Sequence, residues 1–475
     1  MTTQTPTRSW LTLAVTGIAL LMTALDNLVV GVALPSIRAD LGGSIEALQW
    51  TVNAYTLAFA VLLITGAALG DRFGRKRMFV IGVGVFTVAS GLAALSPSIE
   101  TLVAARAVQG LGAAMVTPLT LTLISEAFPP ERRGVALGIW GGISGLGVAL
   151  GPFVGGAVVE GIAWHWIFWL NVPIGLALVP LARRALTESR GPDRELDLRG
   201  LVLAAAGLLG LTFGIVRADA LGWTSATVIA SITAGVAVLV LFVGWELRAP
   251  RPMLPMRFFR SRAFTATNGL SFAMFFGTFG SIFLLSQFFQ TAQSLGPFEA
   301  GLRTLPWTAM PMVVAPIAGA LGAKVGTRPL MATGLALQAI ALAWIAAVSA
   351  PDTPYAELVA PFVLAGTGMA LVFPTAAQTV LSSVGAKEAG KASGATNAIR
   401  EIGGVMGVAV LASVFAANGG YASPQAFTDG VTAALPIAVA VLAVGAVLAL
   451  LVPGKERTAA EPALAAGRQE APAAA

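Results

Sequence analysis

Long apolar runs separated by short polar segments make up most of this chain of 475 residues. A helix needs about 20 mostly apolar residues to cross a bilayer, and runs of that length recur between residues 11 and 452. The pattern therefore predicts an all-α polytopic membrane protein. We expect fourteen transmembrane helices, at residues 11–34, 47–69, 78–96, 101–124, 134–159, 166–184, 199–217, 225–246, 263–290, 300–322, 329–349, 357–381, 392–416 and 431–452.

The basic residues predict how these helices are oriented, because an even number of spans places both termini on one side. Nearly all of the 29 Lys and Arg residues fall in segments on that side. The opposite side holds Arg38, Arg217 and Arg303, and two more, Arg106 and Arg400, lie within spans. Because basic loops remain in the cytoplasm, we expect both termini to be cytoplasmic.

Composition excludes several classes of site. The chain is 56% hydrophobic and 11% charged, whereas soluble domains have about 25% charged residues. It has no cysteine and one histidine, His165, which excludes disulfides, thiol nucleophiles and Cys/His metal clusters within one chain. The basic residues are expected to anchor the helices, with a contribution from anionic lipid, so no nucleic-acid partner is predicted.

One segment imitates a nucleotide-binding loop. Residues Gly385 to Lys391 read Gly, four residues, Gly, Lys, but Ala392 stands where Ser or Thr would hold magnesium. No strand pattern precedes the segment, and the chain shows no catalytic constellation. We therefore expect no enzyme, no nucleotide and no cofactor, with the energy for any transport supplied by an ion gradient.

The chain also repeats itself. A shift of 256 residues aligns Gly and Pro positions of the fourth and fifth spans with those of the twelfth and thirteenth, without a gap. The aligned pairs are Gly110 with Gly366, Gly112 with Gly368, Pro118 with Pro374, Gly134 with Gly390, Gly138 with Gly394, Gly147 with Gly403 and Gly151 with Gly407.

Such a repeat predicts two six-helix bundles with two additional helices inserted between them. Pseudo-symmetric halves with a site at their interface are the physical basis of alternating access. The expected divisions are a cytoplasmic N-terminus at 1–10, an N-terminal bundle at 11–184, the two extra helices with their flanking loops at 185–262, a C-terminal bundle at 263–452 and a disordered tail at 453–475.

The fifth span carries an unusual glycine pattern. Glycines at every fourth position open a flat groove where another helix can approach closely, and a proline among them favours a bend. The spacing resembles the antiporter signature on the fifth helix of the major facilitator superfamily, with ordinary small-residue packing as the alternative. The residues concerned are Gly138, Gly147, Gly151, Pro152, Gly155 and Gly156.

The loop after the second span strengthens the resemblance. Residues Leu69 to Arg77 are similar to the superfamily's motif between helices two and three, which implies an inner gate. In the second half the acidic position is Ala323, so only the first copy can act electrostatically; the alternative is a tight turn with a positive anchor. The motif residues are Asp71, Arg72, Gly74, Arg75 and Lys76.

Two further motifs resemble those of the fourteen-helix drug:proton antiporters. Leu25-Asp26-Asn27 is similar to their first-helix motif, and Arg106 to Gly110 is similar to the fourth-helix motif to which that family assigns proton coupling. The resemblance covers residues from about 11 to 452 and implies the major facilitator fold.

Charges inside the spans point to the same chemistry, because each costs several kcal/mol at mid-membrane unless it is paired or wet. At 1.5 Å per residue, Asp26 and Arg106 lie at similar depths, so an ion pair that opens when Asp26 is protonated is possible. A static structural pair is the alternative. Arg400 and Glu401 are adjacent and cannot share one helix face, and Glu401 is a second protonation candidate.

A cavity lined by apolar groups with sparse polar groups suits lipophilic substrates. Seven phenylalanines between residues 272 and 289 could line it, although lipid-facing or core packing is the alternative for most of them. The residues that we select as cavity candidates are Asn27, Asn53, Tyr55, Gln109, Phe276, Gln287 and Arg400.

Together these features predict a proton-coupled antiporter that exports small lipophilic compounds such as antibiotics, dyes and biocides by alternating access. We expect it in a bacterial cytoplasmic membrane, functioning as a monomer with a small lipophilic substrate, protons and the lipid bilayer as its partners. The alternatives are an importer or symporter on the same fold, and a non-transporting membrane scaffold.

Overall fold

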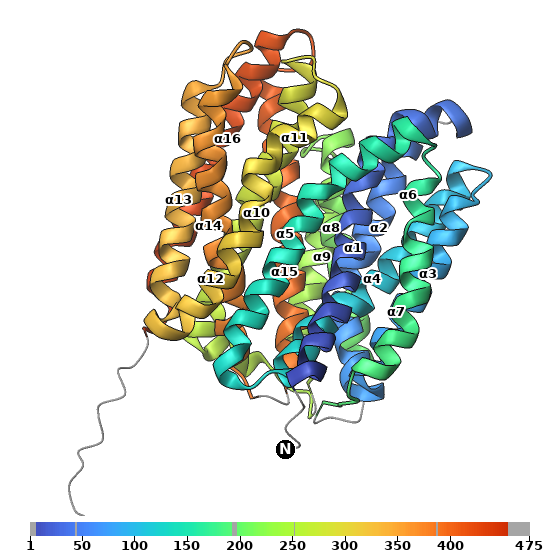
Figure 1. The fold of residues 1–475 in the computed structure, drawn as a ribbon, viewed down its shortest axis with the longest axis vertical. Helices are drawn as coiled ribbons and strands as arrows, with labels where there is room; N and C mark the ends of the chain where they lie inside the picture. Colours follow the sequence, from blue (N-terminus) through green and yellow to red (C-terminus); the bar gives the residue numbers. More distant parts are fainter. Residues whose placement is uncertain (1–5, 43–44, 192–196, 251, 386–387, 455–475) are drawn as a thin grey trace, which may run out of the picture.

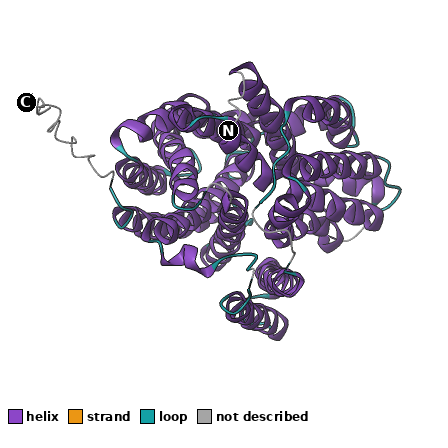
Figure 2. Cartoon of the chain, turned by 90° about the horizontal axis from the view of Figure 1, so that it is seen from below, coloured by secondary structure: helices purple, strands orange, loops and turns teal. Residues whose placement is uncertain are grey.

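A computed structural model describes residues 6–42, 45–191, 197–250, 252–385 and 388–454. Within these residues the regular secondary structure is entirely helical, which confirms the all-α prediction (Figures 1 and 2). The elements are α1 (Pro6–Leu41), α2 (Ile45–Phe73), α3 (Arg75–Ala94), α4 (Ile99–Ala127), α5 (Pro130–Gly161), α6 (Trp166–Trp169), α7 (Asn171–Ala185), α8 (Leu198–Leu221), α9 (Ala226–Glu246), a 3-10 helix η1 (Met256–Arg260), α10 (Arg262–Thr291), α11 (Pro297–Thr308), α12 (Met310–Val325), α13 (Thr327–Val348), α14 (Tyr355–Ser382), α15 (Ala389–Asn418) and α16 (Pro424–Leu450).

All fourteen predicted spans fall on helices, but two of them are divided. The span predicted at 166–184 forms α6 and α7, and the span predicted at 300–322 forms α11 and α12. Proline explains both divisions, because it cannot donate to the carbonyl four residues earlier. Pro173 leaves the carbonyl of Trp169 without its helical partner, and Pro311 does the same for Trp307.

Thirteen stretches of the described residues are long and apolar enough to cross a membrane. They include the α6–α7 pair and the α11–α12 pair, each taken as one span. The remaining predicted span is α5, a helix of 32 residues that includes several side chains outside the described set. The architecture is therefore consistent with fourteen transmembrane helices.

Two groups of helices lie side by side, and α5 and α15 run between them (Figure 1). Helix α5 packs on α1 of the first half and on α12 of the second, while α15 packs on α10 of the second half and on α2 of the first. The helices that the repeat aligns thus occupy equivalent crossing positions. The additional helices α8 and α9 pack on each other, and α8 also contacts α2 and α15.

The glycines of α5 allow close approach to two neighbours. A Cβ atom on Gly147 would lie 2.8 Å from Cβ of Ala24 on α1, and one on Gly155 would lie 3.2 Å from Cγ1 of Val29. Nearer the start of the helix, a Cβ atom on Gly138 would lie 2.5 Å from the carbonyl oxygen of Ala315 on α12. The signature glycines therefore pack against both halves of the molecule.

The remaining signature residues are Gly151, Pro152 and Gly156. Gly156 faces α11, where an added Cβ atom would lie 3.6 Å from the backbone nitrogen of Phe298. Gly151 is buried and shares the face of Gly147 and Gly155 through its four-residue spacing. The side chain of Pro152 lies outside the described residues.

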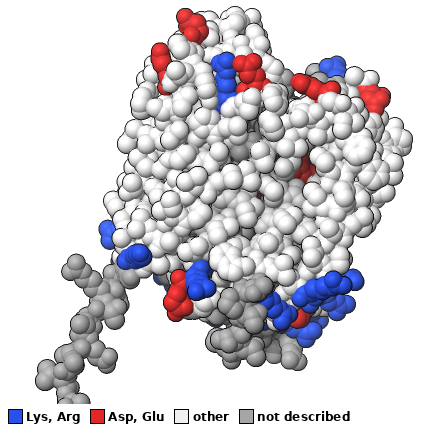
Figure 3. Space-filling model, viewed as in Figure 1, with Lys and Arg blue, Asp and Glu red and all other residues white. Residues whose placement is uncertain are grey.

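Charged side chains gather at the two ends of the helices. Lys and Arg dominate the end at which α1 begins, and Asp and Glu are more frequent at the other end on the face that Figure 3 shows. This asymmetry agrees with the loop charges of the sequence. A broad, mostly white band separates the two ends, broken on this face by a recessed red patch at mid-height, as expected for a largely apolar surface covered by lipid.

Candidate functional site

A buried ion pair joins α1 to α4 in the first half. The Nη1 atom of Arg106 contacts the Oδ2 atom of Asp26, and the side chains are 0% and 1% exposed. The Arg106 Nε atom also donates to the backbone carbonyl of Thr51 on α2 at 3.0 Å. The two charges that sequence reasoning placed at one depth are therefore in direct contact.

Two amides complete the surroundings of the Asp26 carboxylate. Asn171 at the start of α7 donates from Nδ2 to Oδ1 of Asp26 at 2.7 Å, and Gln109 donates from Nε2 to the same oxygen at 3.3 Å. Gln109 also donates to Ser90 Oγ on α3 at 2.7 Å and accepts from Arg106 at 3.0 Å. Helices α4 and α7 thus supply the donors that stabilise the ionised carboxylate on α1, while Thr51 on α2 and Ser90 on α3 accept hydrogen bonds from two of these donor side chains.

Tyr55 on α2 belongs to the same network. The Arg106 guanidinium carbon lies 4.3 Å from the centroid of the Tyr55 ring, and the Tyr55 hydroxyl donates to the carbonyl of Thr23 at 3.0 Å. Helix α2, which carries Tyr55, packs on α15, which carries Glu401.

Arg400 and Glu401 point in different directions, as their adjacency requires. Glu401 is half-buried, whereas Arg400 is 1% exposed and lies among aromatic rings. The Arg400 guanidinium carbon is 4.8 Å from the ring centroid of Phe373 and 5.6 Å from that of Phe275. No ion pair or hydrogen bond joins the two adjacent side chains.

A second charge network lies at the ends of α2, α3 and α4 on the side of the molecule where α1 begins. Arg75 contacts Asp71 at 2.7 Å and also pairs with Glu126. An added Cβ atom on Gly390, in the first turn of α15, would lie 2.4 Å from Oδ1 of Asp71. The Asp71 carboxylate thus meets the positive end of the α15 dipole, so this network links the two halves.

The segment after α7 contacts the start of α3 beside this network. Glu188 accepts hydrogen bonds from the backbone N–H groups of Lys76 and Arg77 at 3.1 and 3.2 Å, which satisfies free donors at the start of α3. Gly74 has φ of 111°, and an added Cβ atom would lie 2.7 Å from the Glu188 carboxyl group. Glycine is therefore required at this motif position. Arg72 is half-buried, and its guanidinium carbon lies 5.0 Å from the Phe73 ring centroid.

Replacing Arg75 with glutamine should destabilise the protein by about 3–5 kcal/mol, because the buried Asp71 carboxylate would lose its counter-ion. The side chain of Asp71 is 5% exposed, so water cannot replace its lost contact, whereas the more exposed Glu126 can be hydrated. Thermal unfolding of the purified protein would measure the effect. Arg77→Gln is the matched control, since Arg77 is exposed; equal melting temperatures for both variants would contradict the prediction.

The cavity candidates do not form one cluster. Gln109 is 0% exposed and belongs to the Asp26 network, and Phe276 packs against Gly407 on α15. Gln287 lies near the end of α10 and accepts from the Tyr421 hydroxyl at 2.6 Å. Asn53 is half-buried on α2. The side chain of Asn27 lies outside the described residues.

Sequence reasoning assigned no role to three side chains that the structure places in these networks: Ser90, Asn171 and Glu188. Asn171 carried a signal, since it is an amide inside an otherwise apolar span. Ser90 and Glu188 carried none, because their roles depend on which helix ends meet. No group of three or more His, Asp or Glu side chains within the described residues is placed to hold a metal ion.

Comparisons with known proteins extend these observations. The family model of the Major Facilitator Superfamily matches residues 16–408 and 269–473. The tetracenomycin C resistance and export protein of Streptomyces glaucescens is 34% identical over 424 residues, which are 89% of this chain and 79% of that protein. The multidrug efflux pump LfrA of Mycolicibacterium smegmatis is 37% identical over 422 residues, or 88% and 82% of the two chains.

A solved structure shares the fold. The human organic anion transporter MFSD10 (TETRAN) aligns with a TM-score of 0.67, covering 94% of this chain and 100% of the solved chain. The two sequences are 15% identical, so this likeness concerns the arrangement of helices alone.

Proposed function

The chain belongs to the major facilitator superfamily, and from this premise we propose that it exports small lipophilic compounds in exchange for protons. Relatives about 35% identical are named as antibiotic resistance and multidrug efflux proteins, which supports export over import. The membrane would be the bacterial cytoplasmic membrane, with both termini in the cytoplasm. The functional unit would be the monomer, and no cofactor would be needed.

The observation that carries proton coupling is the contact between Asp26 and Arg106. Protonation of Asp26 cancels the ion pair and leaves Arg106 with weaker partners, so the helices held by that carboxylate are released. Those helices come from several parts of the first half, and α2, which carries Tyr55, packs on α15. A proton can in this way change the relative stability of two arrangements of the halves.

The second charge network, of Asp71, Arg75 and Glu126, would control access from the cytoplasmic side. Asp71 and Arg75 hold the inner end of the first half against the start of α15, which closes the cytoplasmic side. Opening that side requires the carboxylate to leave the helix end. Alternating access then consists of breaking this contact while the glycine faces of α5 and α15 keep the two halves in register.

Everted membrane vesicles test the proposal. When respiration acidifies the vesicle lumen, adding a transported compound should release protons from the lumen, seen as recovery of a pH-sensitive dye. A symporter would give the opposite sign, and a scaffold would give no signal. Either of these outcomes, with expression verified in the same membranes, would overturn proton-coupled export.

A further inference from the structure

One buried arginine has no hydrogen-bond acceptor for its guanidinium N–H groups. The fully buried arginine side chains in the described part of the chain are Arg75, Arg106 and Arg400. Arg75 and Arg106 contact carboxylates, whereas Nε, Nη1 and Nη2 of Arg400 have no hydrogen-bond partner. A guanidinium group carries five N–H donors, and leaving them unpaired in a protein interior is costly.

Aromatic rings provide part of the compensation. Phe373 on α14 and Phe275 on α10 stack at 5.9 Å between centroids with 26° between their planes, and Arg400 lies over both. Such cation–π contacts are individually modest. They stabilise the charge of the guanidinium group but satisfy none of its N–H donors, so the demand for an acceptor remains.

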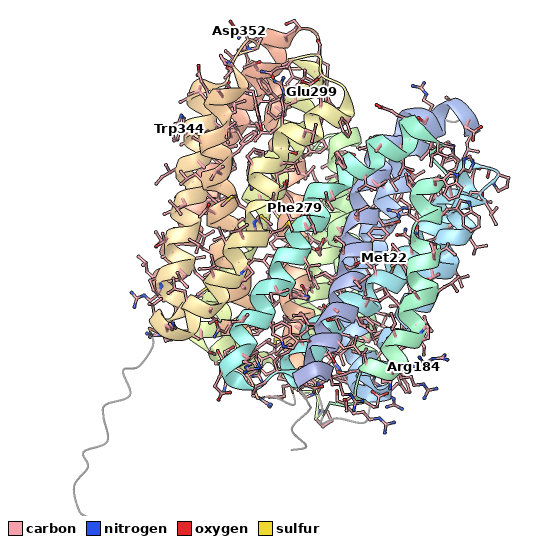
Figure 4. The ribbon with its side chains drawn as sticks, viewed as in Figure 1. Met22, Arg184, Phe279, Glu299, Trp344 and Asp352 are labelled. Atoms are coloured by element: carbon pink, nitrogen blue, oxygen red, sulfur yellow. The ribbon has the colours of Figure 1, made fainter. Side chains whose placement is uncertain are left out.

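These rings belong to a longer aromatic stack that crosses between the halves. Trp140 on α5 lies 5.3 Å from Phe373, and Phe279 lies 5.2 Å from Phe275 with 20° between the planes. Phe279 is half-buried and stands at mid-height of the helices (Figure 4). The stack therefore runs from a partly accessible ring to the buried guanidinium group.

We propose that Arg400 receives the anionic group of an aromatic substrate, a carboxylate or a phenolate, while the substrate's rings stack against Phe279 and Phe275. Guanidinium groups bind planar anions through paired N–H donors, and the aromatic faces suit a flat apolar body. This assignment rests on the proposed export function and specifies its substrate class as acidic aromatic compounds.

The assignment has a measurable consequence for selectivity. A site with an unpaired buried cation gains a charge-assisted hydrogen bond from an acid and a weaker one from a neutral amide, and it repels a cation. We expect an aromatic acid to bind about tenfold to hundredfold more tightly than its matched amide. The corresponding amine should bind more weakly than the amide.

Anthracene-2-carboxylate, its primary amide and the 2-(aminomethyl) analogue form a matched series of fluorescent probes. Their binding to the purified full-length chain in lipid-supplemented micelles can be measured by fluorescence anisotropy at pH 7. The comparison on the unaltered protein requires no variant to fold. Equal affinities for the acid and the amide on this protein would overturn the proposal.

Substitutions at Arg400 then test whether this residue causes the preference for the acid over the amide. Arg400→Gln should remove the preference for the acid by weakening acid binding more than amide binding, whereas Arg400→Lys should retain part of the preference, because lysine keeps the charge without the planar fork. Arg303→Gln is the control, since Arg303 lies on α11 beside Glu299 at 2.9 Å and outside the stack. An acid preference that survives Arg400→Gln would also overturn the proposal.

The outcome is separable from that of the export experiment. Proton release driven by a neutral compound in vesicles, combined with no acid preference in binding, would reject the role of Arg400 and support export. An acid preference without proton release would support the binding site and reject coupling. The binding measurement therefore tests Arg400, whereas the proton-release measurement tests Asp26.

Discussion

Asp26→Asn should reduce substrate-driven proton release to the background of vesicles without the protein. Asparagine nearly preserves the shape of the side chain, but it carries no charge and cannot exchange a proton with water. The variant therefore mimics the protonated state permanently, and Arg106 loses its ionic partner. Because the loss concerns the coupling step and not the apolar spans, we expect insertion and substrate binding to remain.

The control for this variant is Asp40→Asn. Asp40 lies on the same helix, but its side chain is 53% exposed and contacts His165 at 3.7 Å near the other end of α1. Proton release should be close to that of the unaltered protein. If Asp26→Asn exchanges protons for substrate at the normal rate, then Asp26 and Arg106 form a static structural pair.

The membrane spans and the depth of the buried charges could be predicted because both depend on local sequence. Apolar length determines where a helix can cross the bilayer. A rise of 1.5 Å per residue then places Asp26 and Arg106 at similar depths without any knowledge of tertiary contacts. The repeat of 256 residues likewise indicated that α5 and α15 are equivalent, and they do cross between the halves in the same way.

The remaining partners of these charges could not be predicted, because they depend on which helices meet. Asn171 reaches Asp26 only because α7 packs beside α1, and Glu188 reaches α3 only because the chain turns back beneath the first half. For Gln109, the sequence suggested a location, but the packing of the helices decides which groups it contacts. It was selected as a cavity candidate, and in the structure it lies one helical turn from Arg106, where it hydrogen-bonds to the buried side chains of Arg106, Asp26 and Ser90.

Arg400 illustrates a third kind of limit. Sequence reasoning identified it as an intramembrane charge that needed a partner outside its own helix face. The structure places it over Phe275 and Phe373 and gives it no acceptor. Whether a buried charge finds an acceptor within the protein depends on the neighbouring helices, so the missing acceptor of Arg400 becomes visible only when those helices are in place.

Gly138→Ala should shift the protein away from the observed arrangement, which in the proposed cycle is the one with its cytoplasmic side closed. The added methyl group would lie 2.5 Å from the Ala315 carbonyl oxygen and 2.7 Å from Cα of Pro316, both on α12. Backbone atoms of a packed helix cannot yield as a flexible side chain does, so α5 and α12 must separate. Overpacking of this kind costs about 1–3 kcal/mol, which corresponds to a shift of about five- to 150-fold in a two-state equilibrium.

Cysteine labelling can measure this shift, because the chain contains no cysteine of its own. Ser393 is 0% exposed near the inner end of α15 and donates to the carbonyl of Pro118 on α4 at 3.0 Å. A thiol introduced by Ser393→Cys should react faster with a maleimide when Gly138→Ala is also present. Gly84→Ala is the matched control, since no atom lies within 4 Å of its added methyl group. Equal labelling rates in the two backgrounds would show that the contact between α5 and α12 does not hold the inner side closed.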